Sequence, residues 1–157
     1  MKIFYLSVLM MFIVSCDSNR IPKDFAVKID YFGEHYNSKT GVYTRKYNFK
    51  QKSVKILLSE KQKSKLYSFY NEIDFLSFPT EFECDTLKGG GIIPSFWFTI
   101  EITANGIIKS SGTSSRCDYK IEMEKEKKLI IFFDEIRNMI EEDKAYKSLP
   151  ESDRMSL

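Results

Sequence analysis

Apolar and polar residues alternate along two stretches in the first third of the chain, and this period of two is typical of half-buried β-strands. In residues 25–31, apolar side chains occupy every second position: Phe25, Val27, Ile29 and Tyr31. The same alternation in residues 42–49 predicts a second strand, and residues 53–58 predict a third that pairs with it. Residues 33–41 and 50–52 are polar or rich in turn-forming residues, which predicts a loop and a turn.

The strongest local pattern lies in residues 96–114. Aromatic and branched residues alternate there with polar ones, and Asn105-Gly106 follows. Asn-Gly between alternating runs favours a type I′ hairpin turn, because both turn positions need positive φ. The expected register pairs Ala104 with Ile107, Ile102 with Lys109 and Phe98 with Thr113. The aromatic strand is expected to be central and its partner nearer an edge. Trp97 falls on the opposite face from Phe98.

Two further segments have the spacing of amphipathic helices. The first begins at Ser59, which with Gln62 forms a capping-box pattern, and ends near residue 73; its apolar stripe is Leu66, Phe69, Tyr70 and Ile73. The second begins near Glu122 and frays at residues 142–144. The predicted fold class is therefore α+β, with an antiparallel sheet of about five strands, two helices on one face and the order βββαββα. Residues 25–148 form this single domain, and residues 149–157 form a polar tail.

The amino end has a different pattern. Lys2 precedes an almost entirely apolar run over residues 3–14, which ends at polar residues. A charged start followed by an apolar centre is typical of a secretory signal peptide. The run is too short for a membrane span, which needs roughly 20 residues. The alternative interpretation is an N-terminal helix buried in the domain.

The residues that close this run are Ile13-Val14-Ser15-Cys16. This tetrad resembles the lipobox of bacterial lipoprotein precursors. The resemblance implies that residues 1–15 are cleaved off as a signal peptide and that Cys16 carries the lipid, including fatty acyl groups such as palmitate. Several acyl chains on one residue hold a protein stably on a bilayer. Residues 16–24 would then be a lipidated tether, and the protein would be membrane-anchored in a bacterial cell envelope, periplasmic or surface-facing.

Composition narrows the function classes. Of 157 residues, 43% are apolar, which suffices for one core. Without Lys2, 23 basic residues face 22 acidic ones, so no electrostatic footprint for nucleic acid is expected. Cys84 and Cys117 remain as a candidate disulfide in an oxidising compartment, with two buried free thiols as the alternative. Two isolated cysteines and one histidine do not make a metal pattern, and we expect no metal and no cofactor.

Candidate chemistry is sparse. The run Gly89-Gly90-Gly91 is followed by Ile92-Ile93-Pro94, which cannot open a phosphate-binding helix. His35, the only histidine, is expected in a loop without catalytic duty, and no G-x-S-x-G elbow accompanies it. Four acids lie near the aromatic segment and are candidates for a glycosidase-type carboxylate pair, which needs a separation in space that sequence spacing does not give: Glu81, Glu83, Asp85 and Glu101.

We therefore name no catalytic residue, and take Trp97 and Glu101 as candidate binding residues. The favoured function is a non-catalytic module that binds another envelope protein through the sheet surface around Trp97, because exposed tryptophans favour protein interfaces. A membrane-anchored hydrolase acting on cell-envelope polymer is the alternative, and a structural spacer is a third possibility.

Overall fold

The computed structural model describes residues 20–88, 93–116 and 119–152. The predicted signal peptide, Cys16, the glycine run at residues 89–91 and Cys117 lie outside these residues. The described chain forms one six-stranded sheet in the order β4-β3-β2-β1-β5-β6, in which neighbouring strands are antiparallel. The strands are β1 (Ala26–Tyr31), β2 (Glu34–Asn37), β3 (Val42–Tyr47), β4 (Lys50–Lys55), β5 (Ile93–Ala104) and β6 (Ile107–Arg116).

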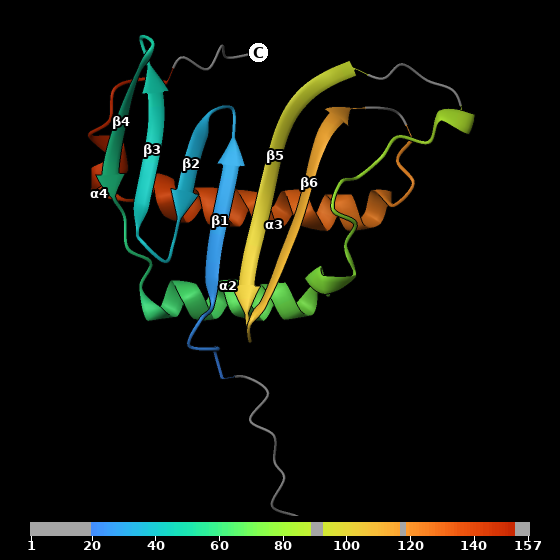
Figure 1. Ribbon diagram of the computed structural model, residues 1–157, viewed down its shortest axis with the longest axis horizontal. Coiled ribbons are helices and arrows are strands. Elements are labelled where there is room, and N and C mark those ends of the chain that lie inside the picture. Colours follow the sequence, from blue (N-terminus) through green and yellow to red (C-terminus); the bar gives the residue numbers. More distant parts are fainter. Residues whose placement is uncertain (1–19, 89–92, 117–118, 153–157) are drawn as a thin grey trace, which may run out of the picture.

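Helices cover one face of this sheet and leave the other face open (Figure 1). The helices are α2 (Glu60–Glu72), α3 (Met123–Glu141) and the short α4 (Lys144–Lys147), with 3₁₀ turns η2 (Phe75–Ser77) and η3 (Thr86–Lys88). The predicted capping box of α2 is present, because Ser59 Oγ accepts from the Gln62 amide and Gln62 Oε1 accepts from the Ser59 amide. The α+β class predicted from the sequence is confirmed.

The core lies between the sheet and the two long helices. The ring of Phe98 on β5 stacks on Phe133 of α3 with centroids 4.2 Å apart, and Tyr31 of β1 meets the same ring edge-on at 5.2 Å. All three side chains are buried. Burial of each large aromatic side chain stabilises the fold by roughly 2–3 kcal/mol, so this cluster ties the central strands to α3.

The β5–β6 hairpin has the predicted register, from Ala104 opposite Ile107 to Phe98 opposite Thr113. β5 is central, between β1 and β6, and β6 is at the edge. Part of that edge is covered by residues 80–82, since the Gly112 amide donates to Thr80 O and the Phe82 amide donates to Gly112 O, both at 3.0 Å.

Two predictions about the first half of the sheet were wrong. Residues 33–41 contain strand β2, and residues 50–52 belong to strand β4. The chain reverses before β2 at Phe32 and Gly33, which both have positive φ, and before β4 at Asn48 and Phe49. The sheet therefore has six strands, whereas the sequence predicted about five.

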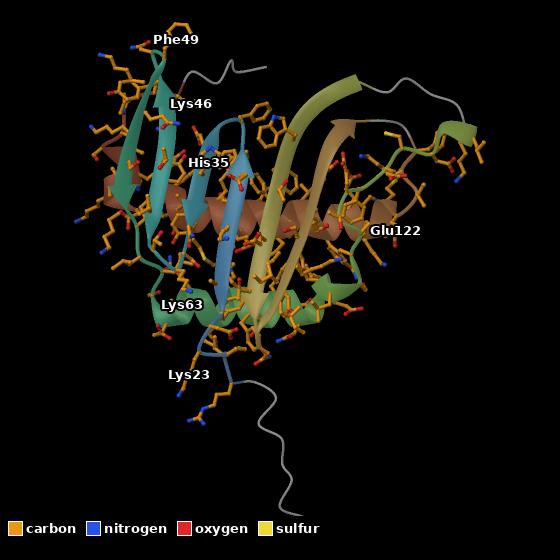
Figure 2. The ribbon with its side chains drawn as sticks, viewed as in Figure 1. Lys23, His35, Lys46, Phe49, Lys63 and Glu122 are labelled. Carbon is orange, nitrogen blue, oxygen red and sulfur yellow. The ribbon has the colours of Figure 1, made fainter. Side chains whose placement is uncertain are left out.

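The two ends of the sheet differ. The chain enters β1 beside the β5–β6 turn, where the Asp24 carboxylate accepts hydrogen bonds from the amides of Asn105 (2.9 Å) and Gly106 (2.6 Å). These bonds, above all the one from Gly106, hold the pKa of Asp24 below its usual value. Lys23 lies at this end, whereas Phe49 lies at the other, which we call the distal end (Figure 2).

Candidate functional site

Trp97 lies near the distal end on the open face of the sheet. The residue is 41% exposed, as the alternation in β5 predicted. Antiparallel pairing of β5 with β1 sets Phe98 opposite Tyr31, and this brings Trp97 close to the turn that follows β1. The Phe32 ring in that turn lies 6.5 Å from the Trp97 ring. The two aromatic side chains thus form one surface, although 65 positions separate them in the sequence.

A groove of about 250 Å³ adjoins Trp97, between the β5–β6 pair and the segment that covers β6. It is lined by Thr80, Glu81, Trp97, Phe98, Thr99, Gly112 and Thr113. The strands approach closely here because position 112 has no side chain: a Cβ on Gly112 would lie 2.5 Å from Phe98 O. With an indole wall, hydroxyl groups and one carboxylate, the groove suits a partly apolar side chain that also carries a hydrogen-bonding group.

Glu101 shares the open face with Trp97 but does not line this groove. Its carboxylate lies 2.5 Å from the Lys28 Nζ on the neighbouring strand, where the register sets the two residues opposite each other. Both side chains are solvent-accessible, so this ion pair contributes at most about 1 kcal/mol to stability. The structure therefore brings Glu101 to Lys28 rather than to the indole.

His35 lies in strand β2 rather than in the predicted loop, and it faces the open side. Its Nδ1 is hydrogen-bonded to the carboxylate of Asp30, which the register places directly opposite. Thr44 on β3 lies opposite His35, and its hydroxyl is hydrogen-bonded to the Ser53 hydroxyl on β4 at 2.8 Å. A carboxylate that fixes one ring nitrogen of a histidine is an arrangement used in acid–base catalysis.

The other predicted acids do not converge on His35 or Glu101. Glu81 and Glu83 line a second hollow of about 140 Å³ together with Glu122. Asp85 caps the turn that follows it by accepting from the Leu87 amide at 3.1 Å, and it pairs with Lys88. Within the described ranges, no three His, Cys, Asp or Glu side chains come together in a way that would hold a metal ion.

Cys84 is partly buried, and its backbone bridges to Lys120. The bridge brings residue 84 close to the segment that follows Cys117. Cys117 itself lies outside the described residues, so the disulfide stays a prediction. The Lys120 ammonium is buried and bonds to Phe82 O (2.9 Å), Thr113 Oγ1 (3.1 Å) and Glu126 Oε1 (3.2 Å). This cluster fastens the covering segment to β6 and α3.

A second buried polar cluster was not predicted. The side chains of Glu34 on β2 and Arg45 on β3 point to the buried side of the sheet, where Arg45 Nε lies 3.3 Å from Glu34 Oε1. The Tyr43 hydroxyl donates to the other oxygen of the Glu34 carboxylate at 2.5 Å. Arg45 also covers the Tyr146 ring at 4.3 Å and donates to Pro150 O at 3.0 Å. The cluster ties the C-terminal segment to the sheet. Charged residues inside an alternating strand give no apolar signal, so the sequence pattern missed it.

Comparison of the sequence with known protein families and with curated proteins found no match to either. In the described part of the chain, none of the helices has both the length and the apolar character needed to cross a bilayer.

Proposed function

We propose that this chain is a lipid-anchored protein of a bacterial cell envelope that acts, without catalysing a reaction, by binding another envelope protein. The observation that carries the proposal is the exposed Trp97, which lies beside Phe32 and borders a groove. Tryptophan is enriched among the residues that dominate protein interfaces, because it covers a large area and loses little entropy on binding.

The orientation of the domain supports this proposal. A tether that leaves near Lys23 holds the opposite end of the sheet away from the membrane (Figure 2). The Trp97 surface then faces the space where other envelope proteins lie. The anchor has its own test: a fatty acid that carries an alkyne should label the full-length protein, and Cys16→Ala should abolish the labelling.

Partner capture tests the binding site. Crosslinking in intact cells, followed by purification of the full-length protein, should recover one abundant partner. Trp97→Ala should lose that partner, because it removes the exposed indole from the proposed surface. Ile130→Ala is the matched control, since Ile130 lies on α3 and is 40% exposed. Equal recovery with a folded Trp97→Ala variant would rule out this surface.

The Asp30–His35 pair favours one second candidate, a hydrolase that acts on envelope polymer. If that candidate is correct, His35→Ala and Asp30→Asn should both abolish turnover of purified cell-wall polymer, and Glu101→Gln would test the carboxylate that pairs with Lys28. Each variant should keep the wild-type melting temperature within a few degrees, because all three side chains are solvent-accessible. Absence of turnover by the wild-type protein would contradict the hydrolase candidate and favour the binding function.

A further inference from the structure

The turn between β3 and β4 has an unusual residue at its tip. Asn48 and Phe49 have φ of 46° and 60°, the same left-handed pair that Asn105 and Gly106 form in the β5–β6 turn, with φ of 53° and 75°. Glycine is favoured at the second position because it has no Cβ. In the β3–β4 turn that position holds a phenylalanine whose side chain is fully exposed. Bulky residues in left-handed backbone are strained, and such strain is concentrated at functional sites.

Lysines surround this tip. Lys46 and Lys50 flank the turn and Lys52 follows in β4, whereas Lys55 lies at the far end of that strand, opposite Val42. Among residues 20–88, 93–116 and 119–152, no carboxylate forms an ion pair with any of these four lysines. Lysines on an edge strand commonly prevent sheet-to-sheet aggregation, and that accounts for those in β4. It does not account for Lys46, which lies on the inner strand β3.

The hairpin is continuous with the Trp97 surface. The Lys46 side chain lies across Gly33 of the β1–β2 turn, because a Cβ built on Gly33 would be 3.2 Å from Lys46 Cδ. Gly33 is next to Phe32, which contacts Trp97. Figure 2 shows Lys46 and Phe49 at the same end of the sheet. Trp97, Phe32, Lys46 and Phe49 therefore form one strip of aromatic and basic side chains, which we call the distal strip.

We infer that the occupant of the distal strip is an acidic protein, with an apolar pocket for Phe49 and carboxylates opposite Lys46 and Lys50. The inference rests on the proposed function and names the chemistry of its partner. An exposed aromatic side chain can fill a pocket on a partner. Lys46 and Lys50 form no ion pair within the described residues, so they can complement carboxylates of the partner and speed association.

The length of the tether excludes one way in which the anchoring bilayer could occupy the distal strip. Eight residue steps from Cys16 to Asp24 span at most about 28 Å. The twelve residues of β5 extend about 40 Å between the ends of the sheet. Since the tether leaves from the end opposite Phe49, it is too short to let the domain stand inverted with its distal end on the membrane that holds the lipid. Contact of the bilayer with the open face of the sheet is decided by the lipid adduct in the experiment below.

Site-specific photocrosslinking in intact cells tests the inference. The full-length protein carries p-benzoylphenylalanine in place of Phe49, Trp97 or, as a control on α3, Ile130. Each version is also made with Lys46→Glu/Lys50→Glu and with Lys61→Glu/Lys128→Glu. The second pair changes net charge equally but lies on the helices, where both lysines are exposed. Adducts are measured by immunoblot and identified by mass spectrometry.

We expect protein adducts of the same mass from positions 49 and 97 and none from position 130. Reversal of Lys46 and Lys50 should lower the position-49 adduct by about tenfold, whereas reversal of Lys61 and Lys128 should leave it unchanged. A position-97 adduct without one at 49, or adducts insensitive to Lys46 and Lys50, would overturn the acidic partner but keep the proposed function. A phospholipid adduct at 49 would also overturn the inference. Protein adducts at neither position would contradict both.

Discussion

The guanidinium of Arg45 lies 3.3 Å from the carboxylate of Glu34 in the interior, where both side chains are almost wholly shielded from solvent. Arg45 reaches from there to the Tyr146 ring and to the Pro150 carbonyl. One side chain thus joins β2 and β3 to the C-terminal segment. Two buried charges are tolerated when they pair, but each is costly without the other.

Replacement of Arg45 alone should therefore destabilise the fold strongly. We expect Arg45→Met to lower the free energy of unfolding by about 3–5 kcal/mol, because it leaves the Glu34 carboxylate buried without its cation. Urea denaturation followed by circular dichroism measures the loss. The exposed neighbour provides a control, since Lys46→Met should change stability by no more than about 0.5 kcal/mol. If Glu34→Leu/Arg45→Met is no more stable than Arg45→Met, the loss is not due to an unpaired charge.

Tyr31 should make the free energy of unfolding decrease as the pH rises in the alkaline range. Burial, together with Tyr43 and Glu34 nearby, raises the pKa of the Tyr31 hydroxyl far above its ordinary value. Above about pH 10 the unfolded tyrosine loses its proton while the folded one keeps it, so unfolding is favoured. The free energy of unfolding should fall by roughly 1 kcal/mol per pH unit on account of this residue. Denaturation at pH 9 to 11 should show a shallower fall for Tyr31→Phe; identical slopes would contradict this origin.

At the strained turn we predict a substitution that raises the stability of the fold. Phe49→Gly should stabilise the fold by about 0.5–1 kcal/mol, because glycine adopts positive φ without a Cβ clash. The reciprocal control is Gly106→Ala, which should destabilise by about 1 kcal/mol for backbone reasons alone, since nothing lies within 4 Å of the added Cβ. Thermal unfolding measures both. A destabilised Phe49→Gly variant would mean that the ring supports the fold, which would weaken the case for a binding role.

The predicted disulfide between Cys84 and Cys117 is testable by alkylation and mass spectrometry. In the non-reduced, unfolded protein neither residue should react with iodoacetamide, and both should react after reduction. Cys84→Ser should expose the Cys117 thiol and lower stability by roughly 2–4 kcal/mol. If both thiols react without reduction, the two cysteines are buried free thiols, which was the alternative interpretation.

The sequence predicted those parts of the fold in which local pattern and turn chemistry agree. Asn105-Gly106 marks a hairpin turn by itself, and the register of β5 and β6 follows from it. Asn48-Phe49 makes the same turn without a glycine, so the turn was predicted directly after it, at residues 50–52. Strand β2 was missed because its buried face includes Glu34, which interrupts the apolar alternation.

The candidate site was predictable only in part. Alternation along β5 was enough to predict that Trp97 is exposed. The neighbours of Trp97 depend on which strand pairs with β5, and pairing between distant strands is set by tertiary packing. The contact with Phe32 and the covering segment at Gly112 therefore had no local signal. The same reasoning applies to Asp30 and His35, since their pairing required β2 to be recognised as a strand.

Fluorescence of Trp97, the only tryptophan in the chain, tests the central claim most directly. The full-length protein is titrated with the purified partner from the capture experiment, and the spectrum of the partner alone is subtracted. If the surface around Trp97 is the binding site, the emission maximum moves to shorter wavelength and acrylamide quenching falls, because the indole leaves water. Unchanged emission and quenching at saturating partner would show that Trp97 stays exposed in the complex, and would contradict the account.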